Sequence, residues 1–183
     1  MRLMIGLTLL ATFPVAAQPT PEAAQRDWGE AIKSSDWATA ARMMHPGAIK
    51  QLRSLFEPIL AFPEAEELGR KLFDLESPGA LSTTPDTVFF AAFLKNSTNE
   101  QGLTEILKTS RTDPLGHIVQ AGDTTLVVSR VTVETEGISI SSFDVQPWVF
   151  ENGRWWGLLK TDFTNMAAML RKALAGPPPD PRR

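Results

Sequence analysis

The spacing of apolar residues divides the chain into a first half with a helical period and a second half with an alternating one. Before Leu115, apolar side chains recur every three or four residues, as in Trp28 and Ile32, and so share one helix face. A capping hydroxyl, a proline and an acid mark helix starts at residues 20–22 and again at 84–86. The pattern predicts helices over residues 20–33, 37–44, 49–60, 63–73, 84–95 and around 103–108.

Breaker residues set limits within this helical half. Pro58 is expected to kink or end the third helix, because proline lacks the backbone N–H that an inner helical position uses. Residues 76–83 contain Ser, Pro and Gly without periodicity and are interpreted as a loop. Residues 96–102 are interpreted as a polar turn between the last two helices of this half.

The second half predicts an antiparallel sheet. Four alternating segments are strand candidates, and their connections are as short as those of hairpins, which requires antiparallel neighbours. The last connection, Asn152-Gly153, is typical of a type I′ turn. The strand candidates cover residues 115–121, 124–134, 138–150 and 154–160, and a final helix covers residues 162–174. The predicted fold class is therefore α+β, with N-terminal helices packed on a four-stranded meander and a C-terminal helix.

The two ends of the chain have compositions of their own. Residues 1–17 match a secretory signal peptide, with Arg2 before an apolar stretch and Val15-Ala16-Ala17 as the small-residue cleavage pattern. Residues 18–175 are predicted to form a single domain, and the proline-rich residues 176–183 an extended tail. We expect an exported protein, in a bacterial periplasm rather than a eukaryotic secretory pathway, because the chain has no cysteine for disulfides.

Composition excludes several classes of function. The formal net charge is −3 and no basic block is present, which argues against nucleic-acid binding. The absence of cysteine removes thiolate metal sites and cysteine nucleophiles, and the two histidines lack metal-ligand spacing. Neither a nucleophile elbow nor a phosphate-binding glycine loop occurs. No metal, cofactor or membrane span is predicted.

Five residues of the predicted sheet are candidates for a pocket or ligand-binding site. His117 lies on the first strand, while Arg130 and Asp144 interrupt apolar stretches of the second and third. With a tight connection, Arg130 and Asp144 would come close enough to form an ion pair on one face or to line a cleft. Trp148 and Trp155 are either the floor of a pocket or part of the core.

Two further groups are expected to have structural roles. His45 follows the second predicted helix, where its ring would interact with the C-terminal end of the helix dipole. Glu151 and Arg154 flank the Asn-Gly turn and should face each other across the hairpin as a surface ion pair of small energy.

Residues 35–46, which end in His-Pro, and residues 150–156 of the closing hairpin resemble segments of the nuclear transport factor 2-like superfamily. This superfamily includes SnoaL-like polyketide cyclases and ketosteroid isomerases. The resemblance implies a curved sheet wrapped around helices, with a pocket for catalysis, small ligands or subunit contacts. In the enzymes a carboxylate or histidine base works beside hydrogen-bond donors, roles that Asp144 and His117 would take here. The usual donor, tyrosine, is absent from this chain.

Three functions follow as hypotheses, and the first is favoured. The chain would bind a small apolar ligand or a protein partner without catalysis. It would alternatively be a cofactor-free isomerase or cyclase, or a structural or dimerisation module of the cell envelope, for which a homodimer is the simplest assembly. An enzyme needs polar groups that converge in a dry pocket, and a ligand binder needs an apolar cavity. A dimerisation module needs an apolar outer sheet face.

Overall fold

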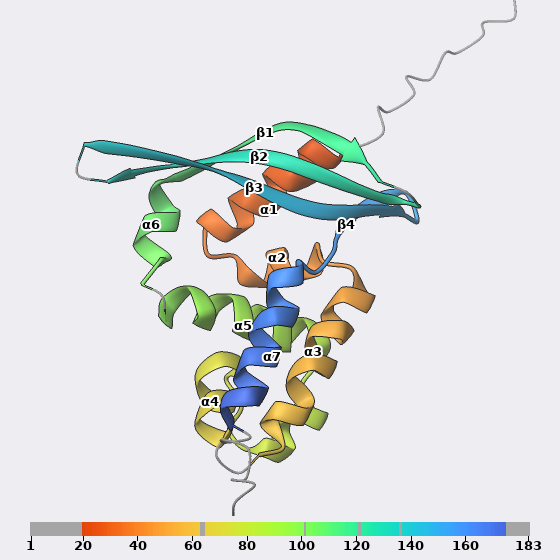
Figure 1. Cartoon of the computed structure of the whole chain (residues 1–183), viewed down its shortest axis with the longest axis vertical. Coiled ribbons are helices and arrows are strands. Elements are labelled where there is room, and N and C mark those ends of the chain that lie inside the picture. The colour runs from red at the N-terminus through yellow and green to blue at the C-terminus, as the bar shows by residue number, and fades with distance from the viewer. Residues whose placement is uncertain (1–19, 63–64, 101, 121, 136, 175–183) are drawn as a thin grey trace, which may run out of the picture.

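The protein has two layers, a sheet and a group of helices, in a computed structural model that describes residues 20–62, 65–100, 102–120, 122–135 and 137–174. In Figure 1 the sheet lies across one end of the molecule with the helices below it. Helix α1 (Pro21–Lys33) packs directly against the sheet, and most other helices lie farther from it. The predicted signal peptide and the predicted tail lie outside the described residues.

Helices α1 and α2 begin where the sequence supplies capping groups. The Thr20 hydroxyl accepts a hydrogen bond from the Ala23 backbone N–H at 3.2 Å, and the Asp36 carboxylate accepts one from Thr39 N–H at 3.0 Å. The remaining helices are α2 (Trp37–Arg42), α3 (Pro46–Leu60), α4 (Glu66–Phe73), α5 (Asp86–Glu100), α6 (Thr104–Thr109), α7 (Thr161–Leu174) and a short 3-10 helix, Pro78–Ser82.

One helix ends as expected and another runs on. Helix α3 ends at Leu60, the predicted limit, and includes Pro58, because a proline so near the C-terminus removes only one of the last backbone hydrogen bonds. Helix α5 continues to Glu100, through the predicted polar turn. Asn96 is buried there, and its side-chain amide donates to the Asp74 carboxylate at 2.8 Å, so a tertiary contact extends the helix.

The sheet is the predicted antiparallel meander, with strand order β1-β2-β3-β4. Its strands are β1 (Ser110–Val119), β2 (Thr124–Thr135), β3 (Ile138–Glu151) and β4 (Arg154–Gly157). The predicted type I′ turn is confirmed, since Asn152 and Gly153 both have positive φ, at 55° and 79°.

Two strand limits differ from the expectation. Strand β1 begins five residues early, because Pro114 is tolerated on an edge strand and a bulge follows it. Strand β4 ends at Gly157, three residues before the predicted end. The Gly157 backbone instead bonds to the α2–α3 connection, through its N–H to Met43 O at 2.9 Å and its carbonyl to His45 N–H at 2.8 Å.

The main apolar core lies among the helices and not under the sheet. Phe73 stacks on Phe89 with ring centroids 4.2 Å apart, and Phe93 contacts Phe56 and Phe163 edge-on or tilted. Of the described residues, those in this cluster come from helices or from the segments beside them, and none comes from a strand. The sheet therefore needs contacts of its own to α1.

Candidate functional site

The two faces of the sheet have different chemistry, and the strand register assigns each side chain to one of them. Residues paired across neighbouring strands point to the same side. We call the side toward α1 the inner face and the opposite side the outer face. Trp148, Gln146 and Asp144 are on the inner face with their partners on β2, which are Thr125, Val127 and Ser129. The outer face carries Ile118, Leu126, Val128, Arg130, Phe143, Val145 and Pro147.

The part of the inner face that meets α1 is buried and largely polar, whereas Val119 and Ile140, at its two ends, are exposed. The indole N–H of Trp148 donates to the side-chain oxygen of Gln25 on α1 at 2.9 Å, and both side chains are almost fully buried. The Gln146 amide donates to the Leu158 carbonyl at 2.8 Å. Thr125 and Ser129 are also buried. Hydrogen bonds therefore contribute to the contact between α1 and the sheet, together with the apolar surface of Trp148 and Val127.

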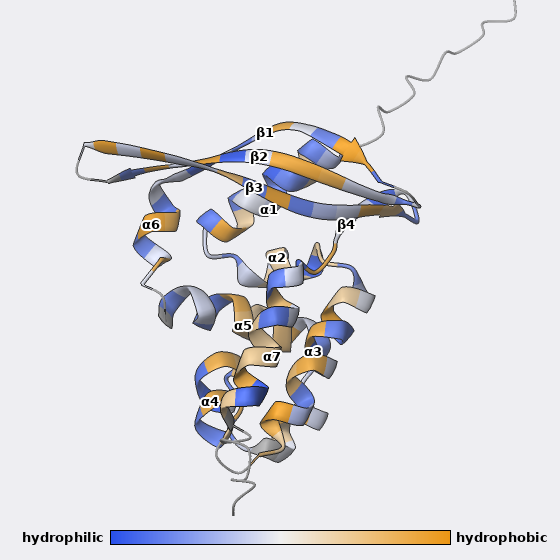
Figure 2. Ribbon diagram, viewed as in Figure 1, coloured by the Kyte–Doolittle hydropathy of each residue, from blue (hydrophilic) through white to orange (hydrophobic). Residues whose placement is uncertain are grey.

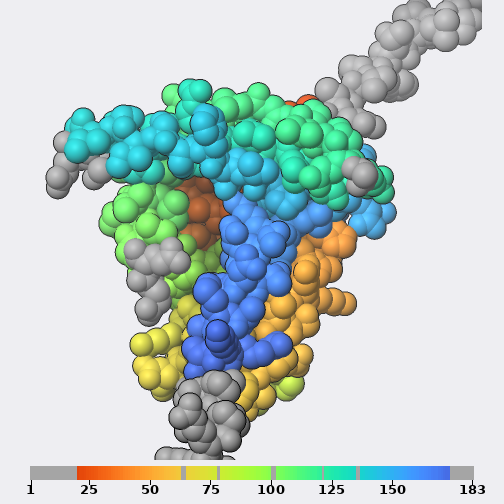
Figure 3. Space-filling view, in the orientation of Figure 1, coloured from red at the N-terminus to blue at the C-terminus, as the bar shows by residue number. Residues whose placement is uncertain are grey.

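The outer face is apolar and exposed between Ile118 and Phe143, and polar beyond Phe143, where Asp113, Thr132 and Ser141 lie. Phe143 is 71% exposed, Ile118 58% and Val145 44%, and the half-buried Leu126 and Val128 lie between them on β2. Within the described part of the chain, Figure 1 shows no helix on this side of the sheet. Figure 2 shows apolar stretches along the uncovered strands, and Figure 3 shows strand side chains forming the surface. This arrangement reverses the usual one, in which the apolar face of an antiparallel sheet meets the core.

A groove borders the outer face. It is open to solvent, has a volume of about 480 Å³, and is lined by Leu126, Val145 and Pro147 on one side and by residues 159–162 at the start of α7 on the other. Asp162 makes no ion pair among the described residues. The Lys160 ammonium is bound by the Asp144 carboxylate at 2.5 Å, so Asp162 is the uncompensated charge at this edge.

The structure separates the predicted site residues His117, Arg130 and Asp144. The expected ion pair between Arg130 and Asp144 is wrong, because Arg130 lies opposite Phe143 on the outer face while Asp144 lies on the inner face. Asp144 binds Lys160 instead. His117 is at the edge of the inner face, where its Nδ1 lies 2.5 Å from a carboxylate oxygen of Glu22 on α1.

The contact of His117 with Glu22 ties α1 to the edge strand. Burial raises the pKa of the Glu22 carboxyl, but the hydrogen bond and charge of His117, with further hydrogen bonds at the helix start, outweigh it, and the pKa is lowered overall. Glu22 is therefore held as a carboxylate. Because His117 and Glu22 are bound to each other, we interpret the pair as a structural link between α1 and β1.

The two candidate tryptophans occupy different environments. Trp148 is fully buried against Gln25, so it belongs to the contact between α1 and the sheet. Trp155 is half-buried, and its ring lies 5.1 Å from that of Phe150 across the hairpin. The five candidates thus do not converge on one cavity.

The structural roles expected at the end of the hairpin are also different. His45 does not act on the helix before it: its Nδ1 accepts the Gly47 N–H at 3.0 Å and caps α3. Its Nε2 lies 2.9 Å from Glu151. Glu151 and Arg154 are paired in register, but Arg154 lies over the Trp156 ring at 3.6 Å and donates to the Arg42 carbonyl. The hairpin is thereby fastened to the α2–α3 connection.

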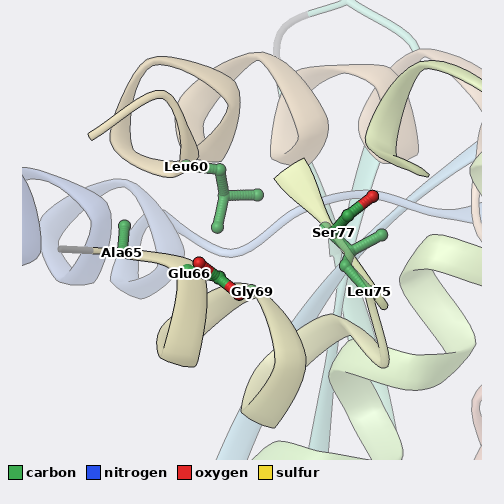
Figure 4. A pocket seen from close by; sticks show the side chains of 6 residues that line it. All are labelled: Leu60, Ala65, Glu66, Gly69, Leu75 and Ser77. Atoms are coloured by element: carbon green, nitrogen blue, oxygen red, sulfur yellow. The ribbon is translucent and has the colours of Figure 1, made fainter. Parts of the chain in front are cut away.

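The enclosed space near α4 is small. The pocket in Figure 4, between Leu60, Gly69 and Leu75, holds about 10 Å³, which is room for a water molecule. Larger hollows beside α2 and α5 are open, with volumes of about 390 and 320 Å³. No group of three or more potential metal ligands occurs among the described residues. In the same part of the chain, no helix is both long and apolar enough to span a bilayer.

Comparison with known proteins gives no match: no family model, curated protein or solved structure is significantly similar to the chain. The resemblance to the nuclear transport factor 2-like superfamily therefore stays a prediction. The α+β architecture is established by the structure itself.

Sequence reasoning missed the outer face. The alternation in β2 places Leu126 and Val128 on one side and Thr125, Val127 and Ser129 on the other, which is visible in the sequence. It does not say which side meets α1. The burial of Ser129 and Gln146 in the structure answers that question.

Proposed function

We propose that this protein is a non-catalytic binding protein whose working surface is the outer face, and that the partner is another protein. One observation carries the proposal: the sheet turns buried polar residues toward its own helix and exposed apolar residues toward solvent. Contiguous apolar surface of this kind marks interaction sites in soluble proteins. Its open form suits a protein better than a small molecule, which buries most of its surface in a pocket.

The exposed surface is large enough to matter for binding. With about 200 Å² for a fully exposed large apolar side chain, Ile118, Phe143 and Val145 together expose about 350 Å². Removing that area from water stabilises a complex by up to about 9 kcal/mol, before the costs of association are subtracted. That is a substantial part of the free energy of a specific complex.

Two of the alternatives, an enzyme and a small-ligand binder, have less support. A cofactor-free enzyme requires free polar groups in a shared cavity, whereas His117 binds Glu22, Asp144 binds Lys160, and Arg130 is on the other side of the sheet. A buried small apolar ligand requires an enclosed pocket, whereas the space beside α4 holds about 10 Å³ and the hollows of about 320–480 Å³ are open to solvent. Because residues 1–17 match a signal peptide, we also propose that binding takes place after export, in a periplasm.

The test compares two valines with similar exposure. Val145 is 44% exposed on the outer face, and Val88 is 54% exposed on α5, so Val145→Lys and Val88→Lys place the same charge at an interface and at a control position. The immobilised protein is used to capture proteins from an extract of the cells that export it, and its own chain counts as a captured species. We expect Val145→Lys to lose the captured species and Val88→Lys to retain it.

Equal capture by wild type and Val145→Lys would refute the outer face as the working surface. A thermal shift caused by lipophilic metabolites and unchanged in Val145→Lys would favour the small-ligand alternative instead.

A further inference from the structure

We infer that the outer face binds a second copy of this chain, in a two-fold symmetric pair in which Phe143 of each copy enters the groove of the other. This inference rests on the proposed function and names its partner. In a two-fold interface one patch faces an identical patch, so the patch must be complementary to itself. The outer face meets that condition in shape and area.

The shape is complementary because the patch contains both a projection and a recess. Phe143 has the highest exposed fraction of the exposed large apolar residues that face outward, at 71%. The groove of about 480 Å³ begins two residues along the same strand, at Val145, and continues to Pro147. A two-fold axis that passes near Val145, perpendicular to the strands, places Phe143 of one copy over Pro147 and Leu126 of the other. An aromatic side chain in such a recess is the usual anchor of a protein interface.

The same symmetry stacks β2 of one copy over β2 of the other. Arg130 lies beside Phe143 in the register, so it comes to lie over Leu126 of the other copy, where its aliphatic stem covers that side chain and its guanidinium stays in water. Asp162 lies on the opposite side of Pro147, because Gly157 and Leu158 pair with the other edge of β3. The charges therefore stay at the rim, and the apolar residues form the centre of the interface.

The area agrees with that of a stable dimer. The three most exposed apolar residues of the patch supply about 350 Å², and Leu126, Val128 and Pro147 bring the apolar surface to about 450 Å². A standard interface buries about 800 Å² on each partner, of which somewhat more than half is apolar. The outer face thus has the apolar content of one half of such an interface. Two sheets that pack face to face would also hide the surface that makes an uncovered sheet prone to aggregation.

The experiment measures the mass of the exported protein in solution by light scattering during size-exclusion chromatography, over a range of concentrations. We expect twice the mass of one chain for wild type. Phe143→Lys should weaken association by at least about tenfold. Ile106→Lys on α6, also at an exposed apolar residue, should leave it unchanged. Circular dichroism and thermal melting confirm that each variant is folded.

A cysteine cross-link tests the arrangement itself. Val145 lies near the two-fold axis and the chain has no cysteine, so Val145→Cys should form a disulfide-linked pair of chains on mild oxidation, whereas Ile106→Cys on α6 should not. Loss of association in Phe143→Lys without a cross-link in Val145→Cys would overturn the arrangement of the two copies.

The two proposals fail in different ways. A single-chain mass for wild type at about 100 μM overturns the second copy as partner, because standard interfaces bind more tightly than this. If wild type is a single chain but captures another protein that Val145→Lys does not capture, the outer face remains the working surface. If neither self-association nor capture depends on Val145, both proposals fall.

Discussion

The hydrogen bond between Gln25 and Trp148 should make a measurable contribution to stability, because it is buried where α1 meets the sheet. The indole N–H and the amide oxygen are 2.9 Å apart, and the two side chains are 0% and 1% exposed. Gln25→Met keeps the length of the side chain but removes the acceptor. The Trp148 N–H then has no partner and no access to water, which costs about 1–3 kcal/mol.

The thermal consequence follows from the size of the domain. For 150–250 residues, 1 kcal/mol corresponds to about 2–4 °C, so Gln25→Met should lower the Tm by about 2–12 °C. Urea denaturation followed by far-UV circular dichroism gives the free energy of unfolding without relying on tryptophan fluorescence. Gln51→Met, at an exposed position of α3, is the matched control and should change stability by less than about 0.5 kcal/mol.

A double-mutant cycle separates the hydrogen bond from the packing of the indole. Trp148→Phe removes the donor and some volume, and in that background Gln25→Met no longer leaves an N–H without a partner. The cost of Gln25→Met should therefore be smaller by about 1 kcal/mol in Trp148→Phe than in wild type. If Gln25→Met has the same cost in both backgrounds, to within about 0.3 kcal/mol, the reasoning about this contact is wrong.

Three further predictions concern the links between elements. The pKa of Glu22 is lowered in the folded state, so wild type should be more stable than Glu22→Gln above pH 4.5, and this difference should decline as the pH falls through the folded pKa. Urea midpoints measured over a pH series test this, and a difference that does not change with pH would show that the carboxylate is not bound. Gly153→Ala forces a side chain into φ of 79° and should lower the unfolding free energy by about 1–2 kcal/mol, whereas Gly79→Ala, with room for a Cβ, should be close to neutral in the same thermal melts. His45→Ala should lower the free energy of unfolding, measured by urea denaturation, by about 1 kcal/mol because the cap of α3 is lost. His45→Asn can still cap the helix, so an equally large decrease in that variant would contradict the capping role.

The secondary structure was predictable where the signal is local. Capping residues such as Thr20 and Asp36 mark helix starts, and the Asn152-Gly153 pair specifies its turn by backbone conformation alone. The prediction failed where a distant contact decides. Asn96 continues α5 because Asp74 binds it, and Pro114 is accepted in β1 because that strand lies at the edge of the sheet.

The candidate site was less predictable for a geometric reason. Alternation tells which residues of one strand share a face, but a shift of one residue between strands moves a side chain to the other side. Arg130 and Asp144 are separated in this way, since Arg130 pairs with Phe143. The partners of the candidates, such as Lys160 for Asp144, depend on where α7 begins and are not encoded near the strands themselves.

The position of α7 in the chain has a consequence for how the protein acquires its structure. Phe163 and Ala167 of α7 pack into the aromatic cluster of α3, α4 and α5, although the whole sheet lies between them in sequence. The cluster is therefore complete only after the ribosome has passed the sheet and released the last helix. In an N- to C-terminal order of synthesis, Phe93 and its neighbours wait exposed for about seventy residues. Docking of α7 is therefore the last step that removes this aromatic surface from water.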